Sequence, residues 1–211
     1  MLKVLYEDNH LIAVFKPAGI LVQADEGGDK CLMDEVKEYL KEKYKKSGNV
    51  FLGLIHRLDR PVSGVVLFAK TSKGASRLSE QFRNHTIEKI YQAEVIGCPK
   101  ENRGTLVNYL VKDENKNKVA VFDKEAPGSQ RAELYYEVIK KEGKNSFLKI
   151  ILKTGRSHQI RSQLAHLGHP IKGDVKYGAP EPLSDQSIAL SAVSLTFATA
   201  TSNETKTVSM E

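Results

Sequence analysis

The first third of the chain alternates short apolar runs with polar turns, which predicts two strands and a helix. Residues 2–6 alternate apolar and polar side chains, as in a strand with one buried face. Residues 11–15 are continuously apolar and end at the KPAG sequence, where Pro17 and Gly19 indicate a turn. Apolar positions at helical spacing then predict an amphipathic helix over residues 31–46: Leu32, Val36, Tyr39 and Leu40.

A buried strand followed by a second helix is predicted next. Residues 64–69 (GVVLFA) are apolar throughout, as in a strand covered on both faces. Thr71 or Ser72 offers an N-cap for the helix that follows. The inner face of that helix would carry Ala75, Leu78 and Phe82.

From residue 90 onward the pattern favours strands. They are expected over residues 91–96, 106–111, 119–122 and 190–197, and residues 131–139 and 147–152 predict a hairpin around KEGKN. A last helix is expected over residues 157–167, capped by Ser157, with Gly168 after its end. Its inner face would carry Ile160, Leu164 and Leu167. Clustered strands with interspersed helices predict one α+β domain over residues 1–211, with a mixed, mostly antiparallel sheet.

Composition excludes several classes of protein. The 211 residues are 40% hydrophobic and 27% charged, which is globular and neither disordered nor fibrous. No apolar run approaches the ~18 residues of a membrane span. Glu7 and Asp8 interrupt the N-terminal segment where a signal peptide would be apolar. We therefore expect a cytoplasmic protein, a monomer, with Cys31 and Cys98 reduced.

The net charge of +6 is concentrated in one stretch of the chain. The stretch from Lys140 to Arg161 contains seven Lys or Arg residues and a single acidic residue, Glu142. A local basic surplus favours a polyanion such as nucleic acid, although a solvated lysine-rich surface is equally consistent with charge alone.

Three short segments carry candidate chemistry. In HRLDRPVSG, residues 56–64, two arginines flank Asp59 and favour its ionised form, although Asp is also a common turn residue. In TGRSHQIR, residues 154–161, a predicted helix start beside Arg156 and His158 offers a phosphate site or an ordinary polar surface. In KIYQAEVIG, residues 89–97, Tyr91 alone is best explained as a core residue.

Taken together, four motifs resemble the RluA-type RNA pseudouridine synthases, in that family's order. They are KPAG at 16–19, HRLDRPVSG at 56–64, KIYQAEVIG at 89–97 and TGRSHQIRSQLAHLGHPIKGDVKYG at 154–178. The resemblance implies a mixed sheet with a central active-site cleft, and a reaction without cofactor or metal. It also implies rRNA or tRNA as the partner, and a stand-alone catalytic domain without the S4 RNA-binding domain.

The resemblance also implies roles for individual residues. Asp59 would be the nucleophile, Tyr91 would pack beside the target base, and Arg161 would be the ion-pair partner of Asp59. Arg57 would take the place of the flipped-out base. Further substrate contacts are expected from the remaining motif residues: His56, Lys89, Arg156, His158 and Gln159.

Two other functions and a metal site remain alternatives at this stage. A non-catalytic RNA-binding module could use the same fold, although it would not need a charged aspartate in a basic site. A hydrolase of nucleoside linkages is a weaker option, because such enzymes typically use two carboxylates. His166 and His169 have ligand-like spacing, but Gly168 and Pro170 break the helix between and after them, so we expect no metal.

Overall fold

The computed structural model describes residues 2–25, 27–202 and 204–210, and the chain divides into two compact units. The first unit comprises Met1–Glu88 and Ala192–Glu211, and the second comprises Lys89–Ser191. The single domain expected from the sequence stays a prediction, because a division by contacts does not test whether the units fold separately.

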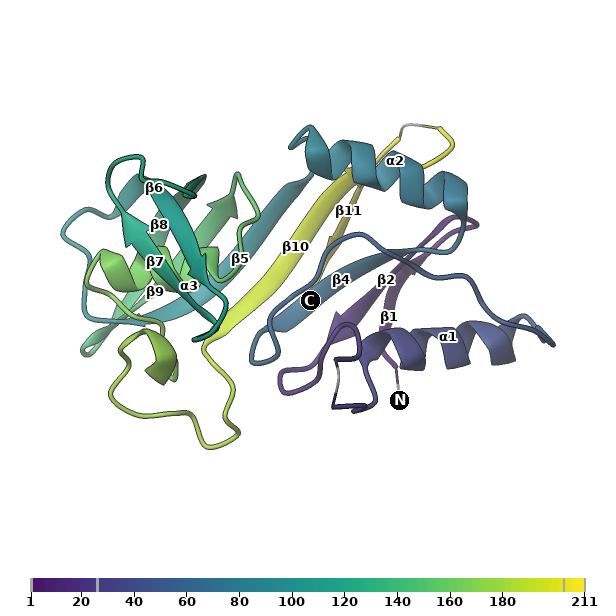
Figure 1. Ribbon diagram of the computed structural model, residues 1–211, viewed down its shortest axis with the longest axis horizontal. Helices are drawn as coiled ribbons and strands as arrows, with labels where there is room; N and C mark the ends of the chain where they lie inside the picture. The colour runs from purple at the N-terminus through teal and green to yellow at the C-terminus, as the bar shows by residue number, and fades with distance from the viewer. Residues whose placement is uncertain (1, 26, 203, 211) are drawn as a thin grey trace. The chain divides into compact units, whose positions relative to one another are not determined.

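The first unit is built on a mostly antiparallel sheet (Figure 1). Its strands follow the order β1 (Val4–Glu7), β2 (Leu11–Lys16), β4 (Ser63–Ala69) and β10 (Leu190–Ala198). The two-residue β3 (Gly53–Leu54) pairs with β4, and β11 (Thr205–Ser209) pairs with β10. β2 and β4 pair in register over their length, from Leu11 opposite Ala69 to Lys16 opposite Gly64.

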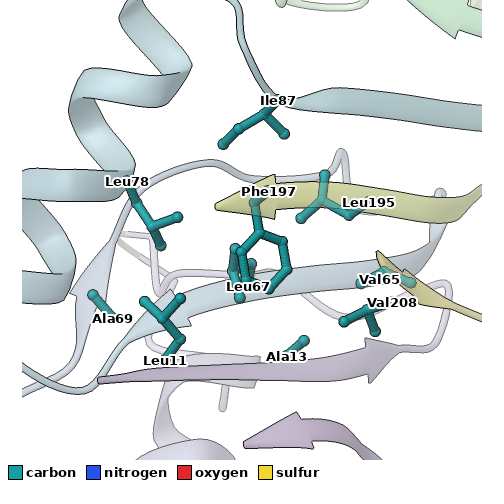
Figure 2. Packing of buried hydrophobic residues seen from close by; sticks show 10 residues of the cluster. All are labelled: Leu11, Ala13, Val65, Leu67, Ala69, Leu78, Ile87, Leu195, Phe197 and Val208. Atoms are coloured by element: carbon teal, nitrogen blue, oxygen red, sulfur yellow. The ribbon is translucent and has the colours of Figure 1, made fainter. Parts of the chain in front are cut away.

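One face of this sheet packs against α2 (Ser72–Arg83), as the apolar spacing predicts. Figure 2 shows Leu78 of this helix directed at Leu11, Leu67 and Phe197, all of which are buried. The side-chain oxygen of Thr71 accepts a hydrogen bond from the amide of Gly74 at 3.1 Å, so the predicted N-cap is confirmed.

The opposite face of the sheet is equally buried. Ile12, Val14, Val66 and Phe68 alternate with the residues of the first face, and each is 0% exposed. The other helix of this unit, α1 (Leu32–Lys43), runs beside β1 and β2 in Figure 1 and buries Leu32, Val36 and Leu40. The amphipathic helix predicted over residues 31–46 is therefore confirmed, and it is shorter at its C-terminal end.

The second unit contains a five-stranded antiparallel sheet. Its order is β5 (Glu88–Ile96), β9 (Asn145–Leu152), β8 (Gln130–Glu142), β6 (Arg103–Asp113) and β7 (Lys118–Phe122). β8 and β9 form the predicted hairpin, which closes where Glu142 lies opposite Asn145. A small core joins Leu110, Val119 and Ala132 of the sheet to Tyr177 of the 3₁₀ helix η1 (Val175–Tyr177).

The helix α3 (Gln159–His166) corrects two predictions. Ser157 does not cap it, because His158 holds the N-cap position in a left-handed conformation at φ +50°, without a side-chain cap. Leu167 does not face inward but is 37% exposed, because the chain turns away directly after it. The expected role of Gly168 is confirmed: its φ is +90°, and the amides of Gly168 and His169 close a Schellman motif on Ala165 and Leu164.

The α+β class and the mostly antiparallel sheet are confirmed, whereas β3, β11 and η1 have no counterpart among the predicted elements. In the described part of the chain, the three α-helices are too short or too polar to cross a membrane. The central cleft implied by the resemblance stays a prediction.

Gly64 is a point of close approach between β4 and β10. Its φ is +136°, and a Cβ at this position would lie 2.5 Å from the amide nitrogen of Ala192 and against its carbonyl. Both the backbone conformation and the space therefore require glycine. Because Ser63 and Gly64 end the segment that contains Asp59, this approach also fixes where that segment enters the sheet.

We expect Gly64→Ala to lower the free energy of unfolding by at least about 3 kcal/mol, from overpacking and backbone strain together. Denaturant unfolding measures the loss. The matched control is Gly48→Ala, where φ is not left-handed and a Cβ meets nothing within 4 Å; it should change stability by less than about 0.5 kcal/mol. Equal effects of the two variants would contradict the close approach.

Candidate active site

Asp59 lies in the loop that leads into β4, and His56 anchors the beginning of that loop. The Nε2 atom of His56 accepts a hydrogen bond from the amide of Leu67 at 3.0 Å. The imidazole also stacks on Phe82 of α2, with ring centroids 5.0 Å apart. Because Nε2 is an acceptor here, the proton of the neutral ring is on Nδ1. The structure therefore gives His56 an internal anchoring role, and its predicted contact with substrate is untested.

The side chain of Lys16, at the end of β2, holds the other end of the loop. Lys16 is 0% exposed, and its ammonium donates to the carbonyls of Pro17 at 3.0 Å, Arg60 at 3.1 Å and Val62 at 2.7 Å. An ammonium has three donors, so these three carbonyls satisfy it. Burial lowers the pKa of Lys16 to about 8, and the nearby Asp59 carboxylate acts in the opposite direction.

Backbone hydrogen bonds join the KPAG turn to the same loop. The amide of Gly19 donates to the carbonyl of Arg60 at 2.8 Å, and the Nε atom of Arg60 donates to the carbonyl of Gly19 at 2.9 Å. Within the loop, the amide of Val62 donates to the carbonyl of Asp59 at 3.0 Å. The backbone of Asp59 is therefore held from both sides, while Asp59 itself is half-buried and Arg57 is exposed.

In the second unit, Lys89 and Tyr91 lie on one face of β5. They are two residues apart, and they are 7% and 9% exposed. The ammonium of Lys89 lies 3.7 Å from the position that a Cβ on Gly155 would take, which places it beside the TGRS turn. Burial lowers the pKa of Lys89. The structure therefore places these two motif residues together on one buried strand face, and their predicted substrate contacts stay predictions.

Arg161, in the first turns of α3, is buried and forms a two-point ion pair with Asp174. Nε lies 2.7 Å from Oδ2 and Nη2 lies 2.9 Å from Oδ1. The guanidinium also lies over the ring of Tyr177, 5.1 Å from its centroid. Bidentate pairing with a carboxylate fixes the plane of the guanidinium. The predicted partnership of Arg161 with Asp59 stays a prediction.

Asp174 and Tyr177 are site residues that the sequence analysis missed, although both lie within the quoted GHPIKGDVKYG segment. The hydroxyl of Tyr177 accepts from the amide of Val119 at 2.9 Å and lies 2.8 Å from Nδ1 of His158. Gly173, at φ +86°, allows the tight turn that presents Asp174. The sequence offered one indication of this role, the Gly173-Asp174 pair shortly after α3. Nothing in its spacing, however, linked Asp174 to Arg161.

The remaining predicted contacts surround the turn before α3. The side-chain oxygen of Gln159 accepts from the hydroxyl of Thr154 at 2.8 Å and from the amide of Arg156 at 3.0 Å. Its amide group donates to the carbonyl of Glu133 at 3.1 Å. Gln159 is thus committed to shaping the turn. Arg156, by contrast, is exposed.

The two histidines with ligand-like spacing have separate partners. Nε2 of His166 lies 2.9 Å from the Asp123 carboxylate, and Nδ1 of His169 lies 3.0 Å from the carbonyl of Ile96. In the described ranges, no three His, Cys, Asp or Glu residues gather into a group that could hold a metal ion.

Comparison with solved structures defines the class of fold. The chain is similar to the human RNA pseudouridylate synthase domain containing 4, with a TM-score of 0.82 at 24% identity, over 99% of this chain and 88% of that one. The human RNA pseudouridylate synthase domain containing 1 gives a TM-score of 0.79 at 21% identity. The fold is therefore that of a pseudouridylate synthase domain.

Sequence comparison gives the family. Residues 10–166 match the family model described as RNA pseudouridylate synthase. The tRNA pseudouridine synthase C of Vibrio cholerae is 38% identical over 84% of this chain and 75% of its own length. The ribosomal large subunit pseudouridine synthase C of Buchnera aphidicola is 39% identical over 83% of this chain, which spans about half (54%) of that protein. This chain belongs to the RNA pseudouridylate synthase family.

We expect Lys16→Met to lower the free energy of unfolding by about 3 kcal/mol, because three carbonyls lose their donor at once. Thermal or denaturant unfolding gives the value. The control Lys41→Met removes an exposed lysine of α1 and should change stability by less than about 0.5 kcal/mol. If Lys16→Met were as stable as the control, the ammonium would not be holding the loop.

Asp174→Asn should lower the free energy of unfolding by about 3–5 kcal/mol, because it removes a buried carboxylate that pairs with two nitrogens of the buried Arg161. Asp185→Asn is the control, since Asp185 is an exposed residue of the same unit whose carboxylate accepts hydrogen bonds from nearby Ser187. Chemical denaturation of the two variants compares them. A loss below about 1 kcal/mol for Asp174→Asn would contradict a structural role for the ion pair.

Proposed function

We propose that this protein isomerises uridine to pseudouridine in RNA, with Asp59 as the nucleophile. Two findings support the proposal: the chain belongs to the RNA pseudouridylate synthase family, and the loop that bears Asp59 is held rigidly by Lys16. The motif resemblance assigns the nucleophile, and the held loop supports that assignment, because covalent chemistry at a sugar carbon requires a carboxylate on a backbone of fixed position.

The reaction breaks the N1–C1′ bond, turns the base and joins C5 to C1′. Asp59 either attacks C1′ directly or promotes a glycal intermediate. The proton leaves C5 and the base gains one at N1, so the product has the composition of the substrate. No electron acceptor, metal or coenzyme is therefore needed to balance the reaction. Water must be excluded, because hydrolysis would release the base.

The residues of the second unit complete the proposed chemistry. Tyr91 would pack beside the detached base, and Arg161 would be the ion-pair partner of Asp59. The Asp174 carboxylate binds Nε and Nη2 of Arg161, so the guanidinium is already oriented before a second carboxylate reaches it. Asp174 is thus proposed as a positioning residue for Arg161.

The target uridine must leave its stack before it can react, at a cost of roughly a few kcal/mol. We propose that Arg57, which is exposed beside Asp59, fills the space that the base vacates. Basic residues between Lys140 and Arg161 would bind backbone phosphates. Relatives are named for the ribosomal large subunit, for tRNA, or as dual-specificity RNA pseudouridine synthases, and we propose rRNA or tRNA as the substrate.

The test is tritium release from RNA labelled at C5 of uridine, together with pseudouridine mapping of RNA from cells with and without the gene. Asp59→Asn should lower turnover by about 10³-fold or more, because the reaction loses its nucleophile. The control Asp25→Asn changes an exposed aspartate of the same unit and should leave turnover unchanged.

Three outcomes would contradict the proposal. Undiminished turnover by Asp59→Asn would exclude this residue as the nucleophile. Release of free uracil would identify a hydrolase of the nucleoside linkage. RNA binding without any turnover by the wild-type protein would identify a non-catalytic RNA-binding module.

A further inference from the structure

A cavity of about 350 Å³ lies in the second unit, at the turn that precedes α3. Its walls come from the β6–β7 hairpin, from the start of β8 and from the TGRS turn. Its polar lining comes from Lys112, Glu114, Gln130, Arg156 and Ser157, and its apolar lining includes Leu110 and Val119. This volume is at the lower end of the range for small-molecule sites, and it is large enough for one nucleotide.

Arg156 supplies the uncompensated positive charge of this cavity. It is exposed, and its Nε atom donates to the carbonyl of Arg131 at 3.2 Å, which orients the guanidinium. Among the described residues, no carboxylate lies within ion-pair distance of Arg156. Lys112 is neutralised by Glu114 at 2.5 Å. An oriented, unpaired guanidinium favours a phosphate group.

The backbone at His158 keeps the turn facing the cavity. His158 is not glycine, yet its φ is +50°, in the left-handed region that residues with a side chain rarely adopt. Its ring is held 2.8 Å from the hydroxyl of Tyr177, which is buried. Because His158 occupies the N-cap position, the hydroxyl of Ser157 is not used to cap α3 and is exposed at the cavity.

Gln130 lies across the cavity, at the beginning of β8 and opposite Leu110 of β6. Its side-chain amide forms no hydrogen bond with any residue that the structure describes. The neighbouring Leu110 and Val119 are buried and apolar. An amide that presents both a donor and an acceptor above an apolar floor is suited to the edge of a nucleobase.

From these observations we propose that the cavity binds an unpaired nucleotide that flanks the target uridine. Arg156 and Ser157 hold its phosphate, and Gln130 reads the edge of its base. The turn that lines the cavity runs directly into the helix that bears Arg161, so an RNA strand at Arg161 continues past Arg156. This inference rests on the proposed function and makes Gln130 a specificity residue within it.

The experiment uses short RNAs that carry one target uridine, with each of the four bases at either flanking position. Their affinity is measured by fluorescence anisotropy over a range of salt concentrations, and turnover is measured by tritium release. Arg156→Ala should raise Kd and KM by about tenfold and lower the salt slope by about one, with kcat little changed. Gln130→Ala should reduce the preference among flanking bases at least about fivefold. The affinity for the least preferred RNA should stay the same.

Lys100→Ala is the control, because Lys100 is an exposed lysine of the same unit outside the cavity. It should leave affinity, base preference and turnover unchanged. If Arg156→Ala and Gln130→Ala were both indistinguishable from it, the cavity would not bind RNA. A wild-type protein with no base preference at either flanking position would refute the role of Gln130. Failure of turnover alone would refute the proposed function, whereas the affinity measurements decide the cavity independently of turnover.

Discussion

The buried ammonium of Lys16 is the constraint on which the arrangement around Asp59 depends. Removing an ammonium from water costs several kcal/mol, and the penalty is offset only when all its donors are bound. Here the acceptors are the carbonyls of Pro17, Arg60 and Val62. Two of them lie on either side of Pro61, which has no amide hydrogen to help organise the turn. A single side chain on β2 therefore determines the path of a loop more than forty residues away in sequence.

The second unit also buries a cation, but there the partner is a carboxylate and not a set of backbone carbonyls. The buried Arg161 is oriented by the carboxylate of Asp174 and covered by the ring of Tyr177. The turn before it is shaped by the internal hydrogen bonds of Gln159. In both units a charge is removed from solvent and fully paired, so that the neighbouring backbone has one arrangement. Arg57 and Arg156, by contrast, are exposed, and they are the motif arginines that we propose for contact with RNA.

Much of this fold was predictable from the sequence, because most helices and strands bury one face. Their apolar residues therefore recur with the period of a helix or a strand. The helix capped by Thr71 and the hairpin that joins β8 to β9 are examples. The start of α3 was not predictable, because the preference of Ser for N-caps is local, whereas the position of His158 is set by Tyr177, nineteen residues later. Asp59, Tyr91 and Arg161 came from the resemblance. Their supports, Lys16 and Asp174, were missed because a long-range hydrogen bond leaves no periodic signal.

The two units differ in whether their residues are continuous along the sequence, and this difference affects when each strand meets its partner during synthesis. The second unit is one continuous stretch, Lys89–Ser191, whereas the first unit is interrupted by it and needs Ala192–Glu211 to finish. During synthesis from the N-terminus, β4 is exposed long before its neighbour β10 leaves the ribosome. The nascent sheet edge at β4 therefore stays unpaired until β10 has been made, after the whole of the second unit.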